Sequence, residues 1–302
     1  MDGVLAIWKA EGWTSHDVVA KARRLLGMKR IGHAGTLDPM VTGVLPLCLG
    51  RSTRVVEYIQ ERPKAYEATI RLGVATDTED ISGEVIETSE VSNIREQQIR
   101  EVLHSFIGEI DQIPPMFSAI KIDGKRLYEL AREGKTVERK SRKVTIYSIE
   151  LLNLDLDGEH PQFSFSVQCS KGTYIRTLCV DIGKALGVPA TMASLIRTMS
   201  GGITKSQCLT LEQVEEYMNN GTLEQMLVAP ELAIDHLPAT TVQSIKRRYA
   251  IQGQKLYWTD ITGHQLLADH SLVRVFDEED VFLGVFELDK QNHLVKPIKV
   301  FS

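Results

Sequence analysis

The chain has 302 residues, of which 43% are hydrophobic and 25% charged, and its formal net charge is −5 at pH 7. This composition is typical of a globular protein that buries a core, and no apolar run is long enough for a membrane helix, which excludes an integral helical membrane protein. The four cysteines lack metal-binding spacing and the N-terminus lacks the features of a signal peptide, so we expect buried reduced thiols and a cytoplasmic protein.

The N-terminal part is predicted to mix strands and helices around a glycine-rich loop. Residues Val18, Val19, Ala22 and Leu25 recur at helical spacing, whereas the stretch from Tyr66 alternates apolar and polar side chains like a half-exposed strand. The predicted elements are a strand at Gly3–Lys9, a helix from Thr14 or Ser15 to Leu26, a strand at Val44–Leu49, a helix at Thr53–Gln60 and a strand at Tyr66–Leu72.

The middle of the chain continues without the regular strand–helix alternation of a doubly wound sheet. The predicted elements are helices at Ile94–Ile107, Leu127–Arg132, Tyr174–Leu186 and Leu211–Met218, strands at Val144–Leu154 and Gln162–Gln168, and an extended stretch at Ile113–Met116. This pattern favours an α+β fold with a mainly antiparallel mixed sheet flanked by helices.

After Pro238 the pattern changes to one helix followed by short strands. We expect the helix at Val242–Ile251 and the strands at Lys255–Trp258, Leu272–Asp277, Val281–Leu288 and His293–Val300. The sequence therefore predicts two domains, residues 1–237 and a small β-barrel-like domain of residues 238–302.

Basic residues gather in two parts of this acidic chain. Residues 1–64 hold ten Lys or Arg against six Asp or Glu, and residues 121–143 hold nine against four. A local positive field can hold a polyanion whatever the net charge, although such runs are also compatible with ordinary solvated surface.

One carboxylate stands in the glycine-rich stretch GHAGTLDPMVTGVLPLCLG, residues 32–50. Asp38-Pro39 between glycines is a common turn signal, and this is the simpler interpretation. A loop before a buried strand is also where a reactive group is held, and a carboxylate is a suitable nucleophile for a sugar carbon. Such a carboxylate needs a nearby cation to stay ionised in a partly dry site.

Motifs for nucleotide cofactors, metals and serine nucleophiles are missing. The chain has no GxGxxG between a strand and a helix, no HExxH and no GxSxG. We therefore expect neither a cofactor nor a metal, so that side chains alone perform any chemistry.

The stretch around Asp38 closely resembles the catalytic motif of the TruB family, the bacterial tRNA pseudouridine-55 synthases. Further blocks resemble the family in the same order: LGVATDTEDISGEV, IPPMFSAIKIDGKRLYELAREG, CSKGTYIRTLCVDIGKALG and LIRTMSG. Together they span about residues 3–235, and the segment after Pro238 fits the family's small RNA-binding PUA domain.

The resemblance implies the pseudouridine synthase fold and a defined reaction. Members flip out one uridine in the T loop of tRNA, detach its base, turn it and rejoin it through carbon. They need no cofactor, metal or ATP, and the family suggests a monomer without a protein partner.

Site residues carry over from the family's motifs one by one. Asp38 matches the nucleophile, although its target, the sugar or the base ring, stays open. Arg176 matches the arginine that pairs with this aspartate, and Tyr66 the tyrosine that stacks on the target base. These three are the expected catalytic residues.

Four other positions match residues that contact the substrate. Tyr174 corresponds to a second active-site tyrosine, Leu195 to an apolar wall of the base pocket, and His33 to a histidine packed into the RNA. Lys9 matches a lysine near the floor of the site, but the family's proline after it is Ala10 here. Phe117 stands where the family has tyrosine.

The basic insertion, residues 112–143, resembles the family segment that closes over the T arm. Two other functions remain open: an RNA-holding protein that has lost catalysis, and a nucleoside hydrolase that uses an aspartate. The second needs an activated water, and the sequence supplies no evident group for it.

Overall fold

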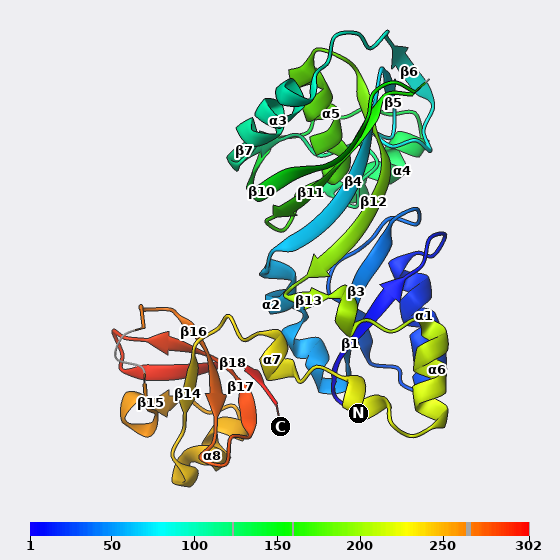
Figure 1. Cartoon of the computed structure of the whole chain (residues 1–302). Helices are drawn as coiled ribbons and strands as arrows, with labels where there is room; N and C mark the ends of the chain where they lie inside the picture. The colour runs from blue at the N-terminus through cyan, green and yellow to red at the C-terminus, as the bar shows by residue number, and fades with distance from the viewer. Residues whose placement is uncertain (123, 159, 264–266, 302) are drawn as a thin grey trace.

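The computed structural model describes residues 1–122, 124–158, 160–263 and 267–301. One nine-stranded sheet extends through two lobes, and a separate five-stranded sheet follows at the C-terminal end of the chain (Figure 1). Among the described residues, the helices are all too short or too polar to cross a membrane.

The first lobe, called the α1 lobe, contains the N-terminal strands and the helices around them. Its elements are β1 (Gly3–Lys9), α1 (Ser15–Leu26), β2 (Ile31–His33), β3 (Thr42–Leu49), the 3-10 helix η1 (Gly50–Val55), α2 (Val56–Glu61), β13 (Ile203–Thr204), η2 (Lys205–Gln207), α6 (Leu211–Asn219) and η3 (Leu223–Met226). Helix α1 begins after Thr14 because the Thr14 and Asp17 side chains cap each other's backbone amides. Its apolar side packs on β1 and β3, whose side chains are almost fully buried.

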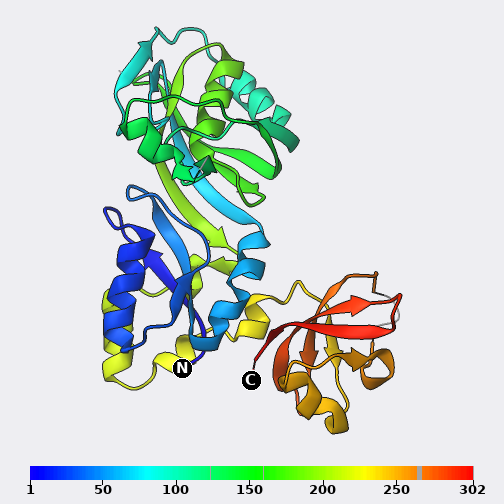
Figure 2. The ribbon, with the colours of Figure 1, turned by 180° about the vertical axis from the view of Figure 1, so that it is seen from behind.

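The second lobe, called the α5 lobe, surrounds the other end of the sheet. Its elements are β4 (Lys64–Leu72), β5 (Val74–Thr76), β6 (Val85–Thr88), α3 (Glu96–Ser105), β7 (Gly108–Gln112), β8 (Lys121–Ile122), β9 (Lys125–Arg126), α4 (Leu127–Arg132), β10 (Arg142–Asp155), β11 (Gln162–Cys169), α5 (Ile175–Leu186) and β12 (Ala190–Ser200). Helices α3 and α5 pack on the sheet through Ile99, Leu103, Leu178 and Ile182, and α5 leans on β12. Figure 2 shows this lobe from behind.

Strand β12 connects the two lobes. The sheet order is β1-β3-β12-β4-β11-β10-β7, so β12 lies between a strand of each lobe. It runs parallel to β3 and antiparallel to β4, whereas the other strand pairs of this sheet in the described residues are antiparallel. The predicted α+β fold with a mainly antiparallel mixed sheet is therefore confirmed.

The C-terminal sheet curls around its own core. Its elements are β14 (Ala239–Thr241), α8 (Ser244–Ile251), β15 (Leu256–Tyr257), η4 (Trp258–Asp260), β16 (Leu272–Phe276), β17 (Phe282–Asp289) and β18 (Leu294–Val300), in the strand order β14-β16-β17-β18-β15. Val273, Val275, Phe286 and Val295 are completely buried in this core.

The C-terminal sheet is attached to the α1 lobe by the short helix α7 (Pro230–Ala233) and by a shared apolar cluster. Tyr58 and Ile59 of α2 belong to the same buried cluster as Phe282 and Phe301. Burial of rings from both parts favours a fixed rather than a swinging arrangement.

Most predicted elements agree with the structure within two residues, but the short strands β2, β5, β6, β7, β8, β9, β13 and β14 and the short helix α7 were not predicted. The prediction missed β12, because its sequence ATMASLIRTMS does not alternate and reads equally well as a loop. The predicted helix at Thr53–Gln60 is wrong in part, since its first half is a 3-10 helix and α-helix begins only at Val56. The cysteines are unpaired, and three of the four are buried as predicted.

Candidate active site

Asp38 lies on the loop between β2 and β3, and its carboxylate is accessible. Leu37 and Val41 are buried on either side, whereas the Asp38 side chain is 48% exposed. The Asp38 carbonyl accepts a hydrogen bond from the Val41 amide, which closes a tight turn. The loop therefore exposes one carboxylate to solvent, while buried neighbours and a backbone hydrogen bond hold its backbone in place.

Two buried side chains of the α1 lobe hold this loop from below. The Ser15 hydroxyl accepts a hydrogen bond from the Leu37 amide at 2.9 Å. The Lys9 ammonium is fully buried and donates to the carbonyls of Ala10, Trp13 and Pro39 at 2.9, 2.6 and 3.1 Å. Burial lowers the pKa of Lys9, and the charge of Asp38 opposes this shift.

Arg176 reaches Asp38 from the first turn of α5 in the other lobe. Its Nη2 lies 3.0 Å from Asp38 Oδ2, and its side chain is only 7% exposed. The same guanidinium donates to the carbonyls of Thr78 and Phe117 at 3.0 and 2.9 Å. Its donors are divided among several acceptors, and it contacts the Asp38 carboxylate through Nη2.

A second carboxylate near Arg176, that of Asp80 in the turn after β5, was missed by the sequence analysis. Asp80 Oδ2 lies 3.8 Å from Arg176 Nη1, and its other oxygen accepts hydrogen bonds from Thr78 and Ser82. The fold brings the turn to the start of α5, a contact that no local pattern of sequence predicts.

Tyr66 lies on β4 beside the Asp38 loop. Its ring is 9% exposed, and burial raises the pKa of its hydroxyl while the charge of Arg197 opposes this shift. Tyr66 pairs across the sheet with Arg197. The charge of Asp38 is a further, smaller cause of the raised pKa of Tyr66.

Tyr174 is the residue before α5, and Gln112 holds it in place. The Tyr174 amide donates to the Gln112 side chain at 2.7 Å, and that side chain donates back to the Tyr174 carbonyl at 3.0 Å. The Arg142 guanidinium lies 4.7 Å from the centre of the Tyr174 ring. Tyr174 is thus tied to both ends of the basic insertion, through its backbone to Gln112 and through its ring to Arg142.

Leu195 is half-buried on β12 and touches the cores of both lobes. It pairs across the sheet with Ala68 of β4. This position at the junction of the lobes is compatible with a wall of a base pocket.

His33 ends β2 just before the Asp38 loop. Its ring packs edge-on against His16 at the start of α1, with ring centres 5.5 Å apart. Burial lowers the pKa of His33, and the neighbouring His16 adds to this shift, so the ring is favoured in its neutral form.

Arg197 is the second residue that the sequence analysis missed. It is 1% exposed and donates from three nitrogens to carbonyls that flank Asp38 in the chain: Nε to Val44 at 2.8 Å, Nη1 to Thr36 at 3.3 Å and Nη2 to Gly35 at 3.1 Å. The only signal in the sequence was that Arg197 stands in the family block LIRTMSG. Its burial, and the partners that a buried charge requires, are visible only in the structure.

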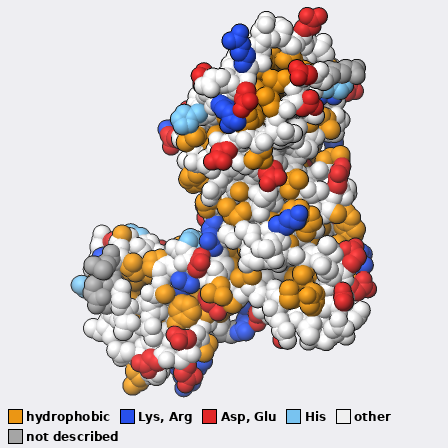
Figure 3. Space-filling model, viewed as in Figure 1, with side chains coloured by type: hydrophobic (Ala, Val, Ile, Leu, Met, Phe, Trp, Pro, Cys, Tyr) orange, Lys and Arg blue, Asp and Glu red, His pale blue; other side chains and the backbone are white. Residues whose placement is uncertain are grey.

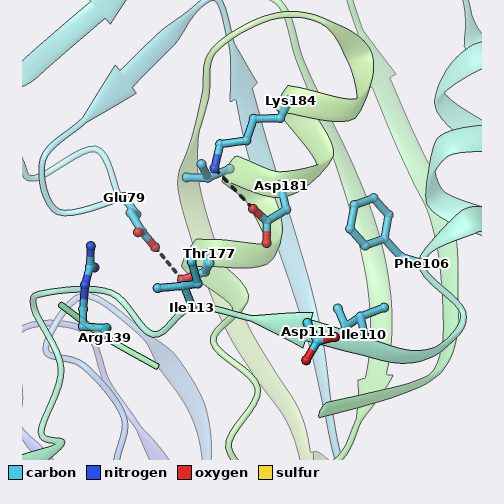
Figure 4. A pocket seen from close by; sticks show the side chains of 10 residues that line it. Glu79, Phe106, Ile110, Asp111, Ile113, Arg139, Thr177, Asp181 and Lys184 are labelled. Carbon is cyan, nitrogen blue, oxygen red and sulfur yellow. Dashed lines mark hydrogen bonds and ion pairs between the residues drawn. The ribbon is translucent and has the colours of Figure 1, made fainter. Parts of the chain in front are cut away.

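A cavity of about 350 Å³ lies beside α5, separate from Asp38. Figure 4 shows Glu79 and Asp181 facing it, with Glu79 joined to Thr177. The Thr177 hydroxyl donates to Glu79 at 2.6 Å, and burial raises the pKa of Glu79. The cavity therefore borders the turn that carries Asp80 and the helix that carries Arg176, but none of the predicted catalytic residues lines it.

Charges of the basic insertion are partly neutralised. Lys125 and Lys135 pair with Glu133, and Lys143 pairs with Glu109.

On the face drawn in Figure 3, Lys and Arg are interspersed with Asp and Glu rather than gathered in one patch. In the described part of the chain, no group of three or more His, Cys, Asp or Glu residues is arranged to hold a metal ion.

The arrangement combines an accessible carboxylate, a buried guanidinium beside it and an aromatic ring on β4, which β12 separates from β3. A carboxylate kept ionised by a guanidinium can act as a nucleophile or a base, and an aromatic ring can stack on a flat base. Among the residues that the structure describes, the side chains named in this site all come from the two lobes of the large sheet.

Two family models match the chain. Residues 23–175 match the TruB family pseudouridylate synthase (N terminal domain), and residues 176–236 match the tRNA pseudouridylate synthase B C-terminal domain. The boundary between the two matches falls inside α5, and residues beyond 236 lie outside both.

Curated relatives match the chain over its whole length. The tRNA pseudouridine synthase B of Geobacillus thermodenitrificans is 52% identical over 308 residues, covering 100% of both chains. That of Bacillus pumilus is 45% identical over 306 residues, covering 100% of this chain and 98% of the relative.

Solved structures share the fold at lower identity. A Cbf5-Nop10-Gar1 complex contains a chain that is 29% identical with a TM-score of 0.78, covering 99% of this chain and 85% of the other. An H/ACA RNP bound to a substrate RNA containing 2′-deoxyuridine contains a chain that is 27% identical with a TM-score of 0.75 and the same coverage.

Proposed function

The chain belongs to the TruB family of pseudouridylate synthases, and from this premise we propose that it modifies one uridine of the tRNA T loop with Asp38 as its nucleophile. As a tRNA pseudouridine synthase, the protein isomerises uridine in tRNA to pseudouridine. The choice of the T loop and the role of Asp38 are the proposed part.

The reaction is an isomerisation whose atoms balance within the substrate. The bond between N1 of uracil and C1′ of the ribose breaks, and a bond between C5 and C1′ forms. One proton leaves C5, and N1 carries one in the product. The chemistry therefore needs a nucleophile that can leave again, a group that accepts a proton and space in which the base turns.

The contact between Asp38 and Arg176 is the observation that supports the proposed nucleophile best. Their atoms lie 3.0 Å apart, with Arg176 buried and Asp38 open to a ligand. A buried cation favours the ionised form of a neighbouring carboxylate, whereas the exposed oxygen stays free to attack. We leave open whether Asp38 attacks the sugar or the base ring, because both need the same ionised carboxylate.

We propose that Tyr66 stacks on the extruded uracil and that Tyr174 and Leu195 bound its pocket. His33 is proposed to contact the RNA at the rim of the loop. For Lys9 we propose a positioning role, because its ammonium is enclosed by backbone carbonyls in place of the substrate contact that the sequence analysis expected.

We propose that the RNA is held by the basic insertion of residues 112–143 and by the C-terminal sheet, which we interpret as a PUA-like RNA-binding domain of residues 238–302. The catalytic domain is then residues 1–237. Phosphate contacts by Lys and Arg can offset the few kcal/mol that base extrusion costs. We expect a monomer that acts on tRNA in the cytoplasm.

A product assay tests the proposal against its two alternatives. The purified protein is incubated with an unmodified tRNA transcript, and the RNA is digested and analysed for pseudouridine and free uracil. We expect one pseudouridine per tRNA, located in the T loop. Free uracil would indicate a nucleoside hydrolase, and binding without product would indicate an RNA-holding protein.

Substitution Asp38→Asn tests the nucleophile itself. The amide keeps the shape of the side chain but removes its charge, so we expect product formation to fall below detection while tRNA binding changes by less than about threefold. A variant that retains turnover would falsify the assignment of Asp38.

A further inference from the structure

Arg197 holds the two ends of the Asp38 loop together. Its three donors reach the carbonyls of Gly35 and Thr36 before Asp38 and of Val44 after it. A guanidinium is planar and presents its N–H groups in fixed directions, so these three carbonyls must keep fixed relative positions. The loop is thereby clamped through its backbone on both sides of Asp38 in the chain.

Because Arg197 is buried, its charge must keep these carbonyl partners. Arg197 is 1% exposed, and burial lowers the pKa of its guanidinium. A buried charge is tolerated where oriented dipoles replace the lost water, and three backbone carbonyls supply such dipoles here. A shift of the loop would therefore leave both a charge and several carbonyls without partners.

Arg197 also contacts the second catalytic element. It is the direct cross-strand partner of Tyr66 on β4 and of Gly43 on β3. The charge of Arg197 opposes the effect of burial on the pKa of Tyr66, and Tyr66 likewise opposes the effect of burial on the pKa of Arg197. One side chain thus connects the loop of the nucleophile to the ring proposed to carry the base.

We propose that Arg197 is a positioning residue for the reaction, which sets the geometry between Asp38 and Tyr66 by bonding to the loop while it pairs across the sheet with Tyr66. The inference rests on the proposed roles of Asp38 and Tyr66. It differs from the role of Arg176, which contacts the Asp38 carboxylate itself.

The test is the single-turnover rate of pseudouridine formation with enzyme in large excess over tRNA transcript. At saturating enzyme this rate does not depend on how much of a variant is folded, so stability losses do not affect the result. For Arg197→Lys we expect the rate to fall about 10- to 100-fold, because one ammonium cannot serve three carbonyls and small displacements of reacting groups are costly. The tRNA dissociation constant is expected to change by less than about threefold.

Arg274 provides a matched control. Its guanidinium also donates to three carbonyls, those of Leu237, Glu231 and Asp235, at 2.8, 2.9 and 3.3 Å, but at the base of the C-terminal sheet. Arg274→Lys removes the same kind of clamp from the part proposed to bind RNA, so we expect it to lower the melting temperature. Because saturating enzyme removes differences in tRNA affinity, we expect the single-turnover rate to stay within about twofold of the parent.

Two further variants examine the link to Tyr66. Arg197→Gln keeps a neutral donor and is expected to lose at least as much rate as Arg197→Lys. In the double variant with Tyr66→Phe, the combined loss should be smaller than the product of the single losses, because the two side chains act as one unit. Multiplicative losses would overturn the link to Tyr66.

An Arg197→Lys rate within about twofold of the parent, or a loss no larger than that of Arg274→Lys, would overturn the proposal. A loss confined to tRNA affinity would also overturn it, since it would indicate a binding role. Asp38→Asn, measured in parallel, separates the test of the proposed function from the test of Arg197. An active Asp38→Asn variant refutes the proposed nucleophile, whatever the result for Arg197.

Discussion

At the scale of single residues, the site depends on cations that are buried and anions that are not. Lys9, Arg176 and Arg197 are all buried, whereas Asp38 remains half-exposed. Backbone carbonyls accept hydrogen bonds from each of the three cations, so their charges are compensated without consuming the carboxylate. This distribution leaves Asp38 available to a substrate while its surroundings are fixed.

Substitution Arg176→Lys tests the division of donors around the guanidinium. A lysine supplies one ammonium where Arg176 serves Asp38 and the carbonyls of Thr78 and Phe117. We expect the single-turnover rate to fall about 100-fold, which corresponds to about 2.7 kcal/mol. Arg100→Lys on α3, which alters an exposed arginine, serves as the control. A rate above one third of the parent would contradict the prediction.

The depressed pKa of His33 predicts a dependence of stability on pH. Because burial lowers the pKa of His33 in the folded protein, the unfolded chain binds more protons as the pH falls through about 6.5. The free energy of unfolding should therefore decrease on acidification below that pH, by at most about 1.4 kcal/mol per pH unit from this group.

Urea unfolding between pH 7.5 and 5.5 measures this dependence. We expect the decrease to be shallower in His33→Asn. His236, whose pKa is also lowered by burial, provides a comparison far from Asp38: His236→Asn should flatten the curve as well but leave the rate of product formation unchanged. If the free energy of unfolding depended on pH equally in the parent and in His33→Asn, the lowered pKa of His33 would be refuted as a cause.

At the scale of elements, the close approach of β3 and β12 decides where the loop lies. Gly43 adopts φ +122°, and a Cβ atom on it would lie 2.2 Å from the Arg197 carbonyl oxygen. Only glycine combines this backbone conformation with such an approach. The parallel pairing of the two strands then brings Arg197 beneath the Asp38 loop.

Substitution Gly43→Ala is expected to destabilise the fold by about 2 kcal/mol or more, because the two strands must separate to admit a methyl group. Gly27→Ala is the matched control: Gly27 also has a positive φ, but a Cβ atom there meets nothing within 4 Å. Its cost should be limited to backbone strain of about 1 kcal/mol. Urea denaturation compares the two, and an equal cost would rule out the close approach as the cause.

At the scale of the whole molecule, an acidic protein must hold an acidic substrate. The net charge of −5 repels RNA at long range, whereas residues 121–143 hold nine basic side chains against four acidic ones. Several of these cations are paired with glutamates on the same lobe, and RNA phosphates can compete for them. The C-terminal sheet is fixed against α2 by a shared apolar cluster, so it presents its surface at a constant distance from the catalytic lobes.

We expect tRNA affinity to be strongly salt-dependent. Between 50 and 200 mM NaCl, the dissociation constant should rise about tenfold or more, because binding to phosphates releases counterions. Filter binding measures the affinity, and the single-turnover rate at saturating enzyme, expected to stay within about twofold, is the control. A dissociation constant that changes less than twofold would contradict a phosphate-dominated interface.

The sequence by itself determined the elements whose signals are local and the residues that family motifs identify. Three features can be predicted without a structure, because each depends on near neighbours in the chain. They are the capping residue Thr14, the alternating pattern of β4 and the loop around Asp38. The family resemblance also named Arg176 as the partner of Asp38. The two side chains come from different lobes and meet at 3.0 Å.

Only the tertiary structure decided which polar groups are buried together. Strand β12 has no alternating pattern, because its neighbours β3 and β4 and the cores on both sides set its environment. Arg197 and Asp80 acquire their positions from that arrangement, and neither distance nor burial is encoded in adjacent residues. A buried charge is tolerated only where the folded backbone supplies its partners, and this condition exists only once the chain has folded.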